Sequence, residues 1–423
     1  MWDTAQACLP NTADWTITAH PLPCPPPEEL SNPVNRATII QNATLFNVST
    51  PIDIDHFESL LHHHPNPAFG RSVVTGLREG FWPCADTNLP GYPCVNDTHI
   101  GTSQIHDEAV FLDAQVNSEV EKNRFSQPFG PNLLSGMYSM PIHAVPKDNS
   151  TTYRMVTNHS AGPFSLNSMI DKAHVSPSLL DNMTHVGDRL IRFRGAKPDS
   201  HLTMWEADVA EAYRLLPVHP HWQLKQVVTL NSVCHVNRRN TFGGHASGAI
   251  WIAFMALVTW IARNVWLVKN LIGAYVNDSS SFDEIDDVAF YCPYSKFLPR
   301  SQALLLELWD ELGISHNKRK QVFGSPLTII SFDVDPNNMS ITLLDAAKKE
   351  SLNEIETWIM KPKKGSNNKG KFKIAQWQSF TGWFNWALNV YPWLRPALNR
   401  IYLKMSGGGK SINKSMDQQH HPL

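Results

Sequence analysis

The chain of 423 residues has almost no net charge. It contains 36 Lys and Arg against 38 Asp and Glu, for a formal charge of −2. A generally basic coat is therefore excluded, and any attraction for polyanions must come from local patches. One such patch lies in a Gly-, Asn- and Ser-rich stretch and consists of Lys361, Lys363, Lys364, Lys369, Lys371 and Lys373. A solvated flexible loop and a phosphate-contacting loop explain this stretch about equally well.

Cysteine is also scarce. The six cysteines are scattered and show no metal-ligand spacing. Asn-x-Ser/Thr triplets occur at Asn42, Asn47, Asn96 and Asn182, but no signal peptide precedes them, so we interpret them as chance. These features predict a reduced, intracellular protein of the cytoplasm or nucleus.

Long hydrophobic runs are limited to residues 246–262, between His245 and Arg263. A membrane-spanning helix needs about 20 apolar residues. The run is shorter and contains Ser247, Gly248 and Thr259. A buried core helix is therefore favoured over a membrane span, and no membrane partner is expected.

The length predicts two or three compact units. Residues 1–50 are Pro-rich and predict a poorly ordered leader, and 51–119 predict a helical extension. Over 120–343 two carboxylate-bearing strands are separated by a helix, and a helix and a hairpin follow them; this order predicts an α+β class. The predicted elements include a hairpin within 140–158, strands at 202–209 and 271–276, a hairpin around 225–237, and a helix at 301–312 closed by Gly313. Residues 344–405 are helical in pattern, and 406–423 predict a disordered tail.

Two short strand-like runs end in carboxylates: Leu202–Asp208 and Ala274–Asp278. This is the pattern of buried strands that deliver acids to a cleft. Two such acids can hold a pair of divalent ions about 3.5–4 Å apart, as in polymerases. Mg²⁺ prefers oxygen ligands, which suits Asp. Where two adjacent acids would serve best, however, the chain has Asn277 before Asp278.

Further motifs keep a fixed order along the chain. They are Glu119–Arg124 with Gln127–Pro131, Asn158-His159-Ser160 with Ser165–Ile170, Asp208–Tyr213 with Leu216–Pro220, Thr241–Gly248, Ala274–Asp278, and Leu312-Gly313-Ile314 with Asn317 and Lys320. In this order, residues 120–405 resemble the reverse transcriptase domain of DIRS/Ngaro-like (tyrosine-recombinase) retrotransposons. The resemblance implies a right-hand polymerase fold, with fingers and an antiparallel palm sheet in 120–343 and a helical thumb or connection in 344–405.

The resemblance implies a two-metal Mg²⁺ site. Asp208 and Asp278 would be metal ligands, and Asn277 falls on the first acid of the usual pair, which weakens the site because an amide brings no negative charge. Lys320 would protonate the leaving group, with Arg319 as a neighbouring candidate. Charges that merely cap a helix are the plain alternative for these two cations.

The resemblance also implies a nucleotide site. Lys147 and Arg154 would grip the triphosphate, although two surface cations on a hairpin would look the same. Tyr213 would lie under the sugar and exclude a 2′-hydroxyl, with a core aromatic as the alternative. Phe242 would stack near the base or the template, and Gly243 would let the backbone approach the nucleotide.

Several positions depart from the family pattern. Asn158 stands where an Asp is usual, and Thr241 and Gly248 replace prolines, which predicts a loosened loop. We interpret Asp283, Asp286 and Asp287 as a solvated acidic loop and not as replacement ligands.

Two functions remain open. One is an RNA-directed DNA polymerase domain that takes an RNA or DNA template with its primer and deoxynucleotide triphosphates. The other is a catalytically inactive nucleic-acid-binding remnant of a retroelement. No RNase H acidic quartet and no recombinase signature is found, so a fragment, a single-domain product or a decayed copy is expected. The oligomeric state is left open.

Overall fold

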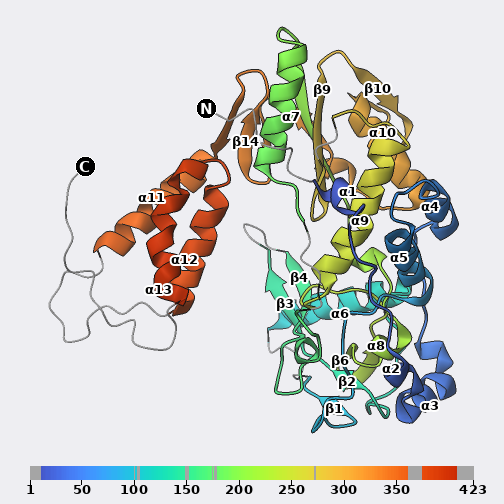
Figure 1. Cartoon of the computed structure of the whole chain (residues 1–423). Helices are drawn as coiled ribbons and strands as arrows, with labels where there is room; N and C mark the ends of the chain where they lie inside the picture. The colour runs from blue at the N-terminus through green and yellow to red at the C-terminus, as the bar shows by residue number, and fades with distance from the viewer. Residues whose placement is uncertain are drawn as a thin grey trace. The chain divides into compact units, whose positions relative to one another are not determined.

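The computed structural model describes residues 11–99, 101, 105–147, 152–173, 175, 179–270, 273–360 and 374–406. These residues form two compact units, one of 11–181 with 205–322 and one of 182–204 with 323–406. Both units mix helices and strands, which confirms the predicted α+β class (Figure 1). The lysine patch of 361–373 and residues 407–423 of the predicted tail lie outside the described residues.

The N-terminal segment of the first unit is helical. Its described part contains α1 (Thr12–Trp15), α2 (Pro27–Ser31), α3 (Pro33–Gln41) and the 3-10 helix η1 (Ala43–Leu45). The expectation of a poorly ordered leader is therefore wrong for residues 11–50. Pro27 and Pro33 each begin a helix, where a missing N–H leaves no hydrogen bond unmade. Ala13 and Ala19 are buried in the main core of the unit.

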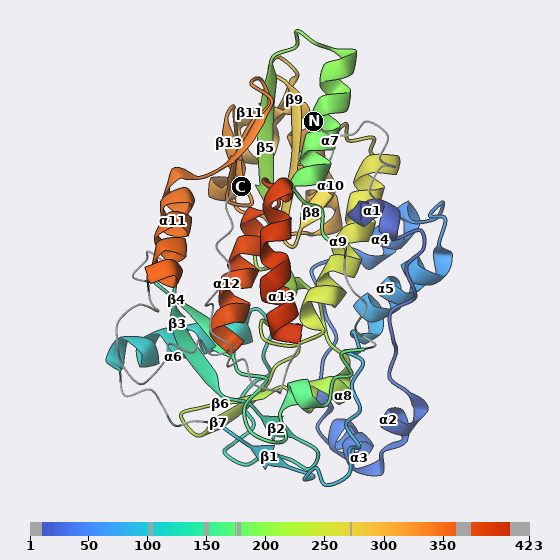
Figure 2. The same ribbon diagram turned by 60° about the vertical axis from the view of Figure 1, so that its left-hand side comes forward.

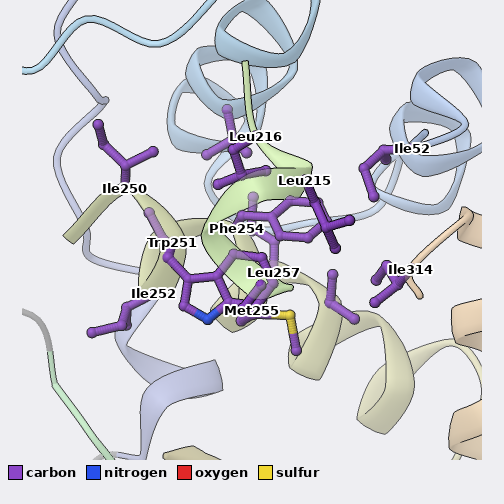
Figure 3. Packing of buried hydrophobic residues seen from close by; sticks show 14 of the residues in the cluster. Ile52, Leu215, Leu216, Ile250, Trp251, Ile252, Phe254, Met255, Leu257 and Ile314 are labelled. Carbon is purple, nitrogen blue, oxygen red and sulfur yellow. The ribbon is translucent and has the colours of Figure 1, made fainter. Parts of the chain in front are cut away.

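The core of the first unit is built around α9 (Ser247–Asn264), against which α1 and α5 (Pro67–Glu79) pack. Figure 3 shows Trp251, Phe254 and Leu257 of α9 in one buried cluster with Leu215 and Leu216. By length and composition α9 could cross a membrane, but 78% of its apolar window is buried inside the protein. The interpretation of this run as a core helix is confirmed.

The carboxylate strands lie in one four-stranded sheet, in the order β12-β5-β9-β8. Its members are β5 (Leu202–Asp208), β8 (Gly273–Tyr275), β9 (Asp278–Glu284) and β12 (Val322–Gly324). Strands β8 and β9 form a tight antiparallel hairpin in which Tyr275 pairs with Asp278. The helix expected at 301–312 is α10 (Arg300–Leu312), and Gly313 ends it in the left-handed conformation at φ 73°.

Two further strand pairs of this unit match the predicted hairpins. The first is β3 (Ile142–Pro146) with β4 (Tyr153–Thr157), which packs on α6 (His106–Glu121), as Figure 2 shows. The second is β6 (Val227–Leu230) with β7 (Val233–Val236), which joins the short strands β1 (Asn96–Asp97) and β2 (Tyr138–Ser139) in the order β1-β2-β6-β7. The remaining elements of the unit are α4 (Ile54–Leu60), η2 (Leu166–Ser168), η3 (Ala212–Leu215), α8 (Pro220–Gln223), β10 (Val288–Tyr291), η4 (Cys292–Tyr294), β11 (Lys296–Pro299) and η5 (Lys318–Lys320).

The second unit combines α7 (Met183–Ala196), a three-stranded antiparallel sheet and C-terminal helices. These elements are β13 (Leu327–Ile329), β14 (Phe332–Asp335), β15 (Ser340–Leu343), α11 (Asp345–Met360), α12 (Ile374–Ala387), η6 (Pro392–Leu398) and α13 (Asn399–Ser406). The aromatic rings of α12 pack within the unit: Phe380 lies 4.5 Å from Trp358, and Trp386 lies 4.8 Å from Phe332, between ring centroids.

The unit boundary differs from the single block expected over 120–343. Residues 182–204 and 323–343 group with the C-terminal helices. Side-chain hydrogen bonds explain the grouping. Asn337 bonds both the N–H and the C=O of Leu202, at 2.9 and 3.0 Å, and Arg194 donates to the carbonyl of Pro336 at 3.0 Å.

Candidate functional site

The structure brings together the two carboxylates that the strand pattern singled out. Asp208 ends β5, and Asp278 begins β9, its neighbour in the sheet. The Asn277 amide nitrogen lies 2.7 Å from Asp208 Oδ2 and 3.3 Å from Asp278 Oδ1. Because one nitrogen contacts both groups, these two oxygens are at most 6.0 Å apart, the sum of the two distances. The Asn277 side chain therefore lies between the two carboxyl groups.

Lys320 completes the surroundings of Asp208. Its Nζ lies 3.0 Å from both Asp208 carboxylate oxygens. The Asp208 side chain is 10% exposed, whereas that of Lys320 is 60% exposed. The ammonium thus approaches a buried carboxylate from the solvent side. The predicted role of Lys320 as a proton donor stays a prediction, and its observed contact is with a candidate metal ligand.

The acids around this site repel one another. Burial, reinforced by Asp208, raises the pKa of Glu206 to about 7. Burial also raises the pKa of Asp278 well above its ordinary range, with Glu206 and Asp208 adding to the effect and Lys320 opposing it. The sequence analysis missed Glu206. The available signal was its spacing of two residues from Asp208, which places both side chains on one face of β5.

The turn that carries Asn277 is strained. Val276 has a φ of 59°, in the left-handed region that is costly for a β-branched residue. The Trp251 indole of α9 donates a hydrogen bond to the carbonyl of Val276 at 2.7 Å. The core helix therefore fixes the turn and, with it, the position of Asn277.

The expected nucleotide-site residues Tyr213 and Phe242 also lie side by side. Their ring centroids are 4.6 Å apart, and Phe242 is 53% exposed. Tyr213 also lies against Trp251 of the core, so the structure is compatible with a packed aromatic as well as a sugar contact. Burial raises the pKa of the Tyr213 hydroxyl.

Gly243 is required by its surroundings. Its φ is 107°, and an added Cβ would lie 2.7 Å from the carbonyl oxygen of Thr157 at the end of β4. Asn167 donates to the Gly243 carbonyl at 2.8 Å and accepts from the His245 N–H at 2.9 Å. Asn167 therefore holds the loop of residues 241–248 in place. The expectation that the missing prolines loosen this loop is wrong. An approach of Gly243 to a nucleotide stays a prediction.

Lys147 and Arg154 lie on the β3–β4 hairpin. Arg154 pairs with Val145, and the Lys147 N–H bonds the Thr152 carbonyl at 2.9 Å, so this register puts both cations on one face. Both are exposed. Within the described residues, no hydrogen bond or ion pair joins either cation to Asp208 or Asp278. Their contact with a triphosphate stays a prediction.

Asp283 does not belong to a solvated acidic loop. It is 3% exposed in β9, and its carboxylate accepts hydrogen bonds from the Ser301 N–H and hydroxyl at 3.0 and 2.6 Å. The expectation that Asp283 lies in a solvated loop is therefore wrong. Strand β9 extends to Glu284, and Asp283 binds the first turn of α10. Asp286 is exposed, as expected.

The donor set does not fit a two-metal site as it stands. The Asp208 carboxylate faces an amide N–H and an ammonium, and both of these are hydrogen-bond donors. Among residues placed well enough to describe, no group of three or more His, Cys, Asp or Glu could hold a metal ion. Asp208 and Asp278 bring two carboxyl groups where two divalent ions would need more negative charge.

Comparison with known proteins adds only distant structural likeness. No protein-family model and no curated protein matches the sequence. The foamy viral protease-reverse transcriptase, in its dRH form with double-stranded DNA, is 14% identical, with a TM-score of 0.49 over 85% of this chain and 56% of that chain. The same viral protein with double-stranded DNA is 14% identical (TM-score 0.48; 86% and 68% covered), and with an RNA/DNA hybrid 13% identical (TM-score 0.46; 86% and 44% covered). The chain thus spans 56% of the first of these proteins, and likeness of this extent says nothing about activity.

Proposed function

We propose that this chain is a reverse-transcriptase-like domain, an RNA-directed DNA polymerase by resemblance of its motifs, whose nucleotidyl transfer is impaired in the present sequence. The observation that carries the proposal is the convergence of Asp208 and Asp278 from neighbouring strand ends, with Asn277 between them. The strand order, the core helix α9 and the strained turn at Val276 all serve to hold these three side chains together.

Two further groups of residues support the substrate class. Tyr213 and the exposed ring of Phe242 offer flat apolar surfaces for a sugar and a base. Lys147 and Arg154 offer two cations on one hairpin face for phosphate oxygens. The partners would be a primer on an RNA or DNA template and deoxynucleotide triphosphates, and the chain would act inside the cell, in the cytoplasm or nucleus.

The impairment follows from charge. Phosphoryl transfer depends on divalent ions that neutralise developing negative charge, and these ions need anionic ligands. Asn277 removes one negative charge from the centre of the site. The proposed Mg²⁺ requirement and the origin in a DIRS/Ngaro-like retroelement rest on the motif resemblance.

A second function is favoured by one observation. The Asp208 carboxylate already accepts hydrogen bonds from Lys320 and Asn277. A catalytically inactive nucleic-acid-binding remnant would keep such a site without loss of its role.

Primer–template binding tests the proposal. Fluorescence anisotropy with a labelled primer annealed to RNA should show binding that weakens steeply with salt, because each neutralised phosphate releases counterions. The same complexes, given nucleotides and Mg²⁺, should extend the primer poorly with the unmodified chain and better with Asn277→Asp. Absence of any duplex binding at low salt would refute both functions. Efficient extension by the unmodified chain would refute the impairment.

A further inference from the structure

The segment that carries Lys320 is fastened to the strand that carries Asp208. His316 forms an antiparallel β-bridge with Val209, which follows Asp208. The Ala210 N–H donates to the Ser315 carbonyl at 2.8 Å, and the Ser315 hydroxyl donates to the Ala210 carbonyl at 2.9 Å. On the other side, Gln321 donates to the backbone carbonyl of Asp208 at 2.9 Å. Backbone and side-chain contacts of the residues before and after Lys320 thus hold this segment beside Asp208.

A second set of contacts shapes the short helix η5. The Asn317 side chain caps it by accepting from the Arg319 N–H at 3.0 Å, and Gln321 also donates to the Asn317 carbonyl at 3.2 Å. His316 is anchored by Asp310, whose carboxylate lies 2.9 Å from its Nε2. These contacts fix the backbone of η5, from which the Lys320 side chain reaches Asp208.

The neighbouring lysine shows that this placement is specific. Lys318 lies in the same short helix, but its Nζ donates to the Tyr294 carbonyl at 2.8 Å. Only Lys320 of the three cations in η5 contacts a carboxylate of the site, within the part of the chain that the structure describes.

We propose that Lys320 is a built-in counter-cation that, together with the Asn277 amide, occupies the Asp208 carboxylate and competes with divalent metal ions for it. This deepens the proposed function, since it takes the Asp208–Asp278 pair to be the site that nucleotidyl transfer would need. The ammonium supplies the positive charge that a buried carboxylate requires. A metal ion can use both Asp208 oxygens only after Lys320 leaves them.

Mn²⁺ binding to the full chain tests the inference directly. Free Mn²⁺ is measured by electron paramagnetic resonance after removal of metals with EDTA, in about 0.1 M salt to limit surface binding. Lys320→Ala should bind one Mn²⁺ more tightly than the unmodified chain by about tenfold or more, equivalent to about 1.4 kcal/mol. Lys318→Ala, which removes the same charge two residues away, should behave like the unmodified chain.

A double variant shows where the ion binds. Asp208→Asn in the Lys320→Ala background should abolish the gain in affinity. Lys320→Gln keeps most of the side-chain length and replaces Lys320→Ala in the Mn²⁺ measurement if the alanine variant fails to fold. The melting temperature of Lys320→Gln, followed by circular dichroism, should rise more with Mn²⁺ than the melting temperature of the unmodified chain.

Equal Mn²⁺ affinity in the unmodified chain and Lys320→Ala would overturn the inference, because Lys320 would then move aside at no cost. An equal gain in Lys318→Ala would also overturn it, since the effect would be one of general charge. Either result would leave primer–template binding intact. Loss of primer–template binding would instead remove the proposed function and leave the Mn²⁺ result standing.

Discussion

Replacement of Asn277 by Asp should destabilise the metal-free protein, even though it restores the acid pair of the family that the motifs resemble. The Asn277 amide donates to Asp208 at 2.7 Å and to Asp278 at 3.3 Å. An aspartate there would put a carboxylate oxygen at the same distances from two other acids. Two like charges about 4 Å apart repel by about 4 kcal/mol at an effective dielectric constant near 20. Lys320 offsets part of this repulsion, so the free energy of unfolding should fall by about 2–4 kcal/mol.

The loss should depend on pH in a defined direction. Neighbouring acids raise the folded-state pKa of the new carboxyl above its unfolded value. Its contribution to stability is therefore fully present below the unfolded pKa, about 4, and is lost as the pH rises through the folded pKa. Urea denaturation in EDTA should show a small effect of Asn277→Asp at about pH 5 and the full effect at about pH 8.

Asn277→Ala separates the two causes of this loss. It removes the amide bonds without adding charge, so it should cost about 1–2 kcal/mol at both pH values. Mg²⁺ should restore stability to the aspartate variant and not to the alanine variant. Equal stability of Asn277→Asp and the unmodified chain in EDTA at about pH 8 would refute the placement of Asn277 between the two acids.

Three further outcomes follow from single features. Gly243→Ala should lower the free energy of unfolding by about 2–3 kcal/mol in urea denaturation, because its Cβ would lie 2.7 Å from the Thr157 carbonyl at a φ of 107°; Gly187→Ala, where a Cβ meets nothing within 4 Å, is the control. Burial raises the pKa of Glu206 to about 7, so the unmodified chain should lose stability relative to Glu206→Gln as the pH rises from about 4 to about 7. The expected loss is about 1–2 kcal/mol, after allowance for screening of the partly exposed carboxylate by solvent. A difference between the two proteins that does not change with pH would contradict this. Substitution of the six patch lysines by glutamine should flatten the salt dependence of primer–template affinity if the patch touches nucleic acid; an unchanged slope would identify a solvated loop.

The sequence located the centre of the site because its signals there are local. A strand pattern that ends in an acid identifies Asp208 and Asp278 without knowledge of the fold, and the motif order suggested that they meet. The capped helix before Gly313 and the β3–β4 hairpin were also predictable, since turn and cap residues act within a few positions.

Contacts between distant segments were not predictable in the same way. The motif resemblance placed Lys320 and Asp208 in one site, but their direct contact joins residues more than one hundred positions apart and was not predicted. Asn337 and Leu202 are also far apart in the sequence, and their hydrogen bonds join Leu202 to the second unit. The boundary between the units therefore differs from the single block predicted over 120–343. The helices of residues 11–50 were missed because the Pro-rich composition was interpreted as a poorly ordered leader, whereas Pro27 and Pro33 begin helices.

The most direct test is incorporation of a single nucleotide on a primer–RNA template, measured by rapid quench in Mg²⁺ for the unmodified chain, Asn277→Asp, and Asn277→Asp combined with Asp208→Asn. We expect little incorporation by the unmodified chain, an increase of about two orders of magnitude or more with Asn277→Asp, and loss of that increase in the double variant. Equal rates for all three proteins, or fast incorporation by the unmodified chain, would contradict the assignment of this site as an impaired polymerase centre.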